Sequence, residues 1–225
     1  ITAETGGSER LRIDSGGKLL IGTTSHQEAY GTSALQIAGT SSATSSMSLI
    51  RHGNSPYLTL GSSGGSSLGA VTALSSGDRI GQLTFAGADG TDISTHAASI
   101  AAYVDGSVSS NNVPARIVFA TGPLETERLR IDSNGMIGFG GVIPKTQNTF
   151  DAIEFGKTGF LGSQTGARTV EMASNAYYNS GWKYKENDVA SQYYQYNGYH
   201  AFSSAVSGSA DGAITFTERL RIDSS

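Results

Sequence analysis

One seven-residue segment recurs at three places in the chain without any change. Glu-Arg-Leu-Arg-Ile-Asp-Ser occupies residues 9–15, 127–133 and 218–224. Internal repetition of this kind indicates an architecture built from recurring units. The copies begin 118 and 91 residues apart, intervals too long and too unequal for the rungs of a tight solenoid. We therefore expect variable cassettes separated by a constant segment, divided as 1–22, 23–141 and 142–225. The last cassette would end in a truncated third hairpin, without the turn and return strand, as in a slice of a longer protein.

Each of the first two copies predicts a β-hairpin. The repeat runs into Gly16-Gly17 in the first copy and Asn134-Gly135 in the second, and a short apolar strand follows. Both pairs favour a two-residue type I′ turn, in which both central residues have positive φ. The sequence therefore predicts strand, tight turn and return strand in each case.

Strict alternation along the first copy assigns its side chains to two faces. Glu9 would share a face with Leu11 and Ile13, and the two arginines would lie on the opposite face. The return strands would complete the apolar face with Leu19, Ile21, Ile137 and Phe139. A lone hairpin is marginal in water, so this face needs a cover.

The repeated arginines could suggest anion binding, but we expect them on the outer face. There they would pair with Glu or Asp of the same or a neighbouring chain, at about 0–1 kcal/mol each. The three pairs are Arg10 and Arg12, Arg128 and Arg130, and Arg219 and Arg221.

The segments between the repeats also resemble short strands and loops. Strands are expected at 48–52, 57–60, 79–85 and 115–120, and a loop at 61–67. Segment 97–104 fits either a short helix or a strand. No segment has the sustained 3.6-residue period of a packed helix, so the chain is expected to be all-β.

The composition indicates that such a chain needs partners. Ser, Thr and Gly supply 83 of the 225 residues, and Leu, Ile, Val and Phe only 46. Chains with so little apolar surface stack repeats or oligomerise, and three copies around an axis would also remove exposed strand edges. A net charge of −4 argues against nucleic acid, and the absence of an 18-residue apolar run argues against membrane insertion.

Several blocks of the sequence resemble one known family. The repeat with its Gly-Gly or Asn-Gly turn and Ile-Gly strand resembles the cassette of bacteriophage tail fibres, especially those of marine phages and cyanophages. The blocks at 77–92, 98–106, 114–119 and 175–184 are similar to those fibres too, in the same order. Together they cover most of the chain.

This resemblance implies a repeat-built β-structure in a homotrimeric fibre, either β-solenoid- or β-prism-like or made of small β-sandwich cassettes. It implies a structural segment of an extracellular virion fibre that supports host attachment, with other virion tail proteins as partners. Such fibres often end in an endosialidase-type intramolecular chaperone, and no such domain is recognisable here. The same repeat occurs in bacterial surface proteins, so a bacterial surface filament is an alternative.

Aromatic residues are concentrated in segment 177–202. A host-surface glycan could bind there, because aromatic faces with polar rims suit sugars. The same side chains could instead fill an inter-chain core, which we favour. The candidates are Tyr177, Tyr178, Trp182, Tyr184, Tyr193, Tyr194, Tyr196 and Tyr199.

Other chemistry-bearing patterns are weak, and we expect no enzyme, metal or cofactor. Segment 61–65 matches the Gly-x-Ser-x-Gly nucleophile elbow but lacks the strand and helix that the elbow requires. Segment 89–92 lacks most ligands of a calcium loop. No histidine has metal-ligand spacing, although a trimer axis could gather three copies of His26, His52, His96 or His200. A polysaccharide depolymerase would need paired carboxylates, and none cluster in the sequence.

Overall fold

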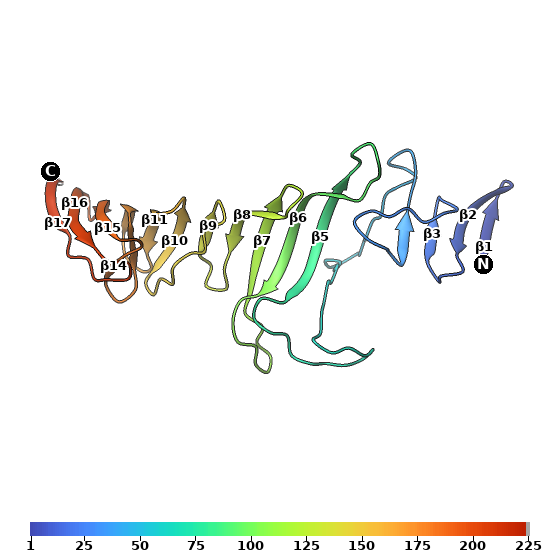
Figure 1. Cartoon of the computed structure of the whole chain (residues 1–225), viewed down its shortest axis with the longest axis horizontal. Coiled ribbons are helices and arrows are strands. Elements are labelled where there is room, and N and C mark those ends of the chain that lie inside the picture. Colours follow the sequence, from blue (N-terminus) through green and yellow to red (C-terminus); the bar gives the residue numbers. More distant parts are fainter. Residues whose placement is uncertain (224–225) are drawn as a thin grey trace. The chain divides into compact units, whose positions relative to one another are not determined.

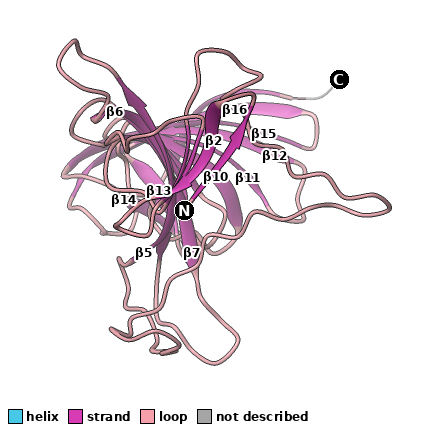
Figure 2. Ribbon diagram, turned by 90° about the vertical axis from the view of Figure 1, so that its right-hand side faces the viewer, coloured by secondary structure: helices cyan, strands magenta, loops and turns pink. Residues whose placement is uncertain are grey.

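The computed structural model describes residues 1–223, so Ser224, the last residue of the third repeat, and Ser225 lie outside the described residues. Residues 1–223 form strands and loops and no helix (Figure 2). The prediction of an all-β chain is therefore confirmed, and segment 97–104 belongs to a strand.

Seventeen strands form three sheets over the described part of the chain (Figure 1). The strands are β1 (Thr2–Thr5), β2 (Ser8–Ile13), β3 (Leu19–Ile21), β4 (Leu35–Ile37), β5 (Arg79–Gly87), β6 (Thr95–Val104), β7 (Ala115–Thr121), β8 (Thr126–Ile131), β9 (Ile137–Phe139), β10 (Phe150–Phe155), β11 (Gly159–Gln164), β12 (Thr169–Ser174), β13 (Ala176–Tyr178), β14 (Trp182–Tyr184), β15 (Asp188–Tyr196), β16 (Tyr199–Gly208) and β17 (Thr217–Ile222). The sheet orders are β1-β2-β3-β4, then β17-β16-β15-β12-β11-β10-β9-β8-β7-β6-β5, and β13-β14.

The chain divides into two compact units. One comprises Ile1–Gly61, Thr84–Ala98 and Gly122–Leu124, and the other comprises Ser62–Leu83, Ser99–Thr121 and Glu125–Ser225. The first repeat lies in the first unit, and the second and third repeats lie in the second.

A β-bulge at the first arginine corrects the predicted faces of the repeat. In β2, Leu11 is opposite Ala3 and Glu9 is opposite Glu4, so Arg10 is an extra residue between them. Because Ala3 and Glu4 point to opposite faces, Glu9 and Leu11 do so too. The expectation that Glu9 shares the apolar face was wrong, since simple alternation takes no account of an inserted residue.

The same bulge recurs in the other two copies. Leu129 and Glu127 are opposite Phe119 and Ala120, with Arg128 inserted. Leu220 and Glu218 are opposite Phe202 and Ser203, with Arg219 inserted.

The bulge creates an ion pair inside every repeat. It brings Glu9 to the face of Arg12, whose Nε and Nη2 donate to the two Glu9 carboxylate oxygens at 2.6 and 2.7 Å. Arg130 and Glu127 have the same two distances, and Arg221 and Glu218 form the third pair. The predicted pairing of the second arginine with a carboxylate is confirmed, within one chain. Two-pronged geometry of this kind fixes orientation as well as adding energy.

The first arginine of each repeat ties the bulge to the preceding strand. Arg10 Nε donates to Thr5 Oγ1 at 3.1 Å, and Arg128 Nε donates to Thr121 Oγ1 at 2.9 Å. In the third copy a serine, Ser204, accepts the bond from Arg219 at 2.9 Å. Within the chain these arginines therefore bond to hydroxyl groups instead of carboxylates.

The turn after the repeat has three residues, not the predicted two. Asp132 N donates to Met136 O, and Gly135 N donates to Asp132 O, which closes a β-turn ending in Gly135. Only Gly135 has positive φ in this turn, at 82°, as Gly17 does at 77° in the first copy. This is a type I-like turn with a glycine bulge instead of type I′. Asp132 Oδ1 selects it by accepting bonds from the amides of Asn134 and Met136, which a two-residue turn would not offer.

The return strand then pairs in parallel with the next strand of the cassette. Ile137 and Phe139 of β9 lie opposite Ile131 and Leu129 on one side, which confirms the predicted apolar face. On the other side β9 pairs with β10 in parallel. Strand β3 repeats this arrangement between β2 and β4. The first and second repeats therefore each build three neighbouring strands, β2-β3-β4 and β8-β9-β10, with their apolar side chains in register.

Of the other predicted segments, most are confirmed and two are wrong. Strands β5 and β7 and the loop at 61–67 lie where the sequence placed them. Segments 48–52 and 57–60 form no strand, and their apolar side chains are exposed, Ile50 and Tyr57 most of all at 78%. Local alternation without a neighbouring strand to pair with does not produce a ladder.

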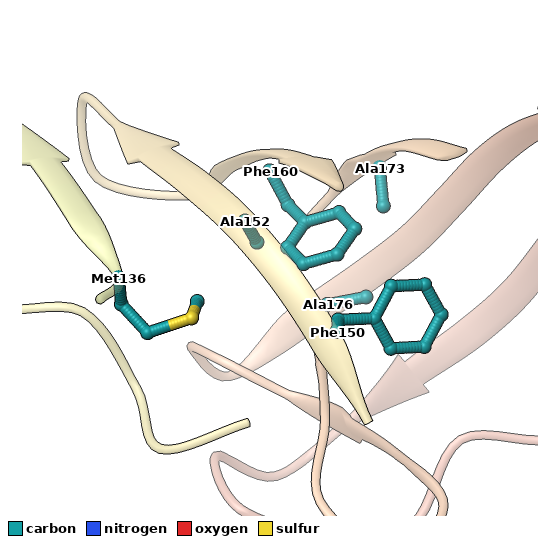
Figure 3. Close-up of a cluster of buried hydrophobic side chains, with 6 residues drawn as sticks. All are labelled: Met136, Phe150, Ala152, Phe160, Ala173 and Ala176. Atoms are coloured by element: carbon teal, nitrogen blue, oxygen red, sulfur yellow. The ribbon is translucent and has the colours of Figure 1, made fainter. Parts of the chain in front are cut away.

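The core of the second unit lies on one face of its sheet. Phe150, Phe160 and Ala173 of neighbouring strands gather with Ala176 of the β13-β14 hairpin (Figure 3). Trp182 covers them, with its ring 5.5 Å from that of Phe150 and 5.6 Å from that of Phe160. This face of β10, β11 and β12 is therefore buried within the chain.

Substitution in the second turn tests its type. Gly135→Ala should lower the free energy of unfolding by about 1–2 kcal/mol, because alanine is strained at positive φ. Asn134→Ala should change it by less than about 0.5 kcal/mol, since Asn134 lacks positive φ. Urea denaturation measures both, and equal losses would indicate a type I′ turn.

Candidate interaction surface

The other face of the second unit's sheet carries an unbroken row of mostly aliphatic and aromatic side chains. Directly opposed residues on nine successive strands from β17 to β7 form this apolar row. Its members are Leu220, Phe202, Tyr193, Met172, Leu161, Ile153, Ile137, Ile131 and Ile117. Side chains opposed across strands contact one another, so the row is one continuous strip.

This row is open to solvent within the chain. Met172 and Leu220 are each 53% exposed, and Ile117 is 44% exposed. Soluble monomers rarely expose contiguous apolar patches of more than a few hundred Å². The first unit has a shorter version of the same strip, where Ile13, Leu19 and Leu35 are opposed across β2, β3 and β4.

The bulges keep two carboxylates off the face that carries the apolar row. Without them, Glu127 and Glu218 would alternate onto the face of Leu129 and Leu220. With them, both carboxylates lie on the opposite face beside their arginines. The apolar row is thus formed entirely by uncharged side chains.

Half of the aromatic cluster is structural. Tyr177 and Tyr184 are buried on the β13-β14 hairpin, and Tyr178 and Trp182 pack against the core cluster. Tyr177 Oη donates to Asp211 Oδ1 at 2.6 Å, and Tyr184 Oη donates to the Val206 carbonyl. These four glycan candidates pack inside the second unit of a single chain, whereas the packing interpretation placed them in a core between chains.

The remaining four tyrosines lie on the β15-β16 hairpin. Tyr199 contacts the rings of Tyr194 and Tyr196 edge-on, with centroids 5.9 and 5.8 Å away. The Arg221 guanidinium lies 4.1 Å from the Tyr199 centroid, a cation–π distance. Tyr193 belongs to the apolar row, and its Oη lies 2.6 Å from His200 Nδ1.

A small hollow of about 420 Å³ lies at the end of this hairpin. Its lining is polar and aromatic, and consists of Arg168, Gln195, Tyr196, Asn197, Gly198, Tyr199 and His200. Only two of the eight aromatic candidates, Tyr196 and Tyr199, line it.

A buried ion pair was not predicted from the sequence. Lys185 Nζ lies 2.9 Å from Glu154 Oε2, and both side chains are almost fully buried. Gln147 Nε2 and the Lys145 amide donate to the same carboxylate, so its oxygens are satisfied. Burial lowers the pKa of Lys185, opposed by the nearby Glu154 charge. Burial and hydrogen bonding inside the fold make this pair a structural element.

Glu171 is a second buried carboxylate that sequence reasoning missed. It lies between Gly162 and Tyr194 on the core face, only 8% exposed, and burial raises its pKa to about 7. The sequence pattern could have predicted its burial. In the strand Thr-Val-Glu-Met-Ala-Ser, alternation places Glu171 on the same face as Ala173.

The structure separates the other sequence candidates. Ser63 Oγ donates to the Ala70 carbonyl at 2.8 Å and braces a loop, with neither flanking strand nor helix. Asp89 Oδ1 accepts bonds from the amides of Thr91 and Asp92 and closes the turn between β5 and β6. Within residues 1–223, no three His, Cys, Asp or Glu side chains gather as a metal-binding group.

Comparison of the chain with known proteins found no match. No protein-family model matches the chain, and no curated protein is similar to it. In the part of the chain that the structure describes, no helix is long and apolar enough to cross a membrane.

The buried Glu171 should make stability depend on pH. Its pKa in the folded state, about 7, is higher than the ordinary value of 4.5, so the folded state holds the proton more tightly. The protonated Glu171 carboxyl therefore contributes its full stabilisation of the folded state below pH 4.5, and this contribution is lost as the pH rises through 7. Glu171→Gln should therefore be more stable than the wild type at pH 8, with the difference shrinking towards pH 4.5.

Urea denaturation at pH 4.5, 6, 7 and 8 measures this difference. Glu186→Gln is the matched control, because Glu186 is more exposed and should leave the pH profile unchanged. A constant difference between Glu171→Gln and wild type would contradict the assignment.

Proposed function

We propose that this chain is a structural segment of a homotrimeric fibre of the phage tail-fibre type, which supports host attachment from the virion surface. The proposal includes contacts with other virion tail proteins and no catalytic role. It also includes the finer architecture: repeat cassettes stacked as a β-prism or β-solenoid. A bacterial surface filament would use the same architecture, and no contact described above favours it.

The observation that best supports this proposal is the uncharged apolar row across nine strands. Three copies of the repeat share one bulge and one internal ion pair, and in each copy Leu and Ile remain on the face opposite the carboxylate. A conserved local geometry that serves only to align strands and expose an apolar face suits a scaffold that assembles with identical chains. Such assembly would also supply the apolar burial that the composition lacks.

The mass in solution tests this proposal. The chain should form a species with three times the mass of the 23.3-kDa chain, measured by size exclusion with light scattering. Met172→Asp places a charge at the centre of the apolar row and should leave a folded monomer, because burying an unpaired carboxylate costs several kcal/mol.

Val71→Asp is the matched control, since Val71 is 95% exposed in a loop outside the row and should remain trimeric. Circular dichroism verifies the fold of each variant. A wild-type protein that is monomeric at micromolar concentration would contradict the proposal.

Glycan binding at the β15-β16 hairpin is a second candidate. The hollow beside Tyr196 and Tyr199 supports it, because an aromatic ring among amide, guanidinium and imidazole groups suits a sugar ring with its hydroxyls. The buried half of the aromatic cluster cannot take part without unfolding the core.

A glycan array separates this candidate from the purely structural one. Tyr196→Ala should lower binding to any retained glycan at least tenfold while the oligomer persists. Tyr57→Ala, in an exposed loop, should bind as the wild type does. Absence of any binding by the wild type would remove the candidate.

A further inference from the structure

An amide, a carboxylate and an amine meet in the interior of the second unit. Gln147 lies in the loop before β10, Glu154 lies on β10, and Lys185 directly follows β14. Glu154 Oε1 accepts a bond from Gln147 Nε2 at 2.9 Å, and Glu154 Oε2 lies 2.9 Å from Lys185 Nζ. Gln147 is 9% exposed, and the side chains of Glu154 and Lys185 are 1% and 4% exposed. One buried carboxylate therefore holds a primary amide on one oxygen and an amine on the other.

The orientation of the Gln147 amide is fixed by its two partners. The Tyr178 backbone N–H donates to Gln147 Oε1 at 2.8 Å. A backbone N–H can only donate and an ionised carboxylate can only accept, so one of the two amide orientations satisfies both partners. The next residue, Asn148, exchanges two hydrogen bonds with Ser180 at 2.9 and 3.1 Å and anchors the same loop.

Lys185 has the surroundings of a nucleophilic amine. Its Nζ donates to the Gly159 carbonyl at 3.0 Å in addition to its contact with Glu154. Burial lowers the pKa of Lys185 against the opposing charge of Glu154, and the nearby Lys145 ammonium lowers it further. A desolvated lysine amine attacks carbonyl carbon once a neighbouring base has taken its proton. The Glu154 carboxylate is in position to be that base.

We propose that Lys185 and Gln147 join in an isopeptide bond, with Glu154 as the proton carrier. The bond between Lys185 Nζ and Gln147 Cδ forms, and the bond between Gln147 Cδ and Nε2 breaks. Of the three Nζ protons, one stays on the new amide, and Glu154 carries the other two to Nε2, which leaves as ammonium. Glu154 ends as a carboxylate, as it began, and no further reactant is consumed.

The contacts select Gln147 as the electrophile. The Tyr178 N–H points at the oxygen on which negative charge develops during attack, and such a fixed donor stabilises that charge. The leaving nitrogen faces Glu154, which returns the proton it needs. Reaction requires Nζ and Cδ to be about 3–3.5 Å apart. Because both groups are held by one carboxylate, a small movement of the lysine side chain brings them together.

The bond would close the chain covalently around part of its core. It joins the loop before β10 to the end of β14 and encloses residues 147–185. A crosslink of this kind restricts the unfolded chain, as a disulfide does, and this chain has no cysteine for one. The inference goes beyond the proposed fibre and does not depend on self-association, since all the groups belong to one chain.

Mass spectrometry of the full wild-type chain tests the bond. After incubation at pH 8 until its mass is constant, the protein should be lighter than its sequence by the mass of one ammonia molecule. Trypsin should then release residues 146–157 joined to residues 184–219, because a crosslinked Lys185 is no longer cleaved. The joined peptide is the deciding signal, since cyclisation of an Asn-Gly pair also loses ammonia but joins no peptides.

Two variants assign the roles, each with a matched control. Lys185→Met should keep the full sequence mass, whereas Lys157→Met, at an exposed lysine, should still lose ammonia. Glu154→Gln should slow bond formation by a factor of about 100 or more, because it removes the proton carrier. Glu171→Gln, at the other buried carboxylate of the same face, should react as the wild type does. Circular dichroism verifies the fold of each variant.

The wild-type protein decides the outcome even if a variant fails to fold. The joined peptide with loss of ammonia supports the bond. A wild type that keeps its full mass overturns the inference and leaves the proposed fibre intact. Loss of water instead would place the bond at Glu154 and overturn the role of Gln147. A folded Glu154→Gln variant that reacts as fast as the wild type overturns the role of Glu154.

Discussion

The β-bulge at the first arginine of each repeat is the constraint on which the open face depends. One extra residue reverses the side of the preceding glutamate, which then meets the second arginine instead of lying beside leucine and isoleucine. Because a carboxylate beside the apolar row would have to be desolvated on assembly, this local insertion favours contact between the row and another apolar surface. The hydroxyl bonds from Arg10 and Arg128 then hold the bulge in place.

The two faces of the second unit's sheet have opposite roles. One is completed inside the chain by the β13-β14 hairpin, Trp182 and the Glu154–Lys185 ion pair. The other remains open and is apolar from β7 to β17. The buried ion pair therefore lies on the completed face, while the apolar row lies on the face left open within the chain.

Sequence reasoning recovered what depends on local pattern. The hairpins, the return strands and the all-β class follow from alternation and turn residues. The predictions for the face of Glu9 and for the turn at Gly135 were wrong. A β-bulge adds one residue before Leu11, and an aspartate-capped loop adds one residue to the turn. Alternation assigns faces by residue number alone, so it cannot detect an added residue. The nine-strand apolar row could not be predicted from the sequence. Tyr193 lies opposite Phe202 on one side and opposite Met172 on the other, and these pairings depend on the register between strands that are far apart in the chain.

The parallel step after each repeat has a consequence for how such chains diversify. Because β9 and β10 run in the same direction, the chain must cross over between them, and Gly140 to Thr149 form that crossing outside the ladder. The entropy of closing a loop grows only slowly with its length, so insertions at such crossings are tolerated thermodynamically. New loops can therefore be gained or lost here over generations while the register of the sheet persists.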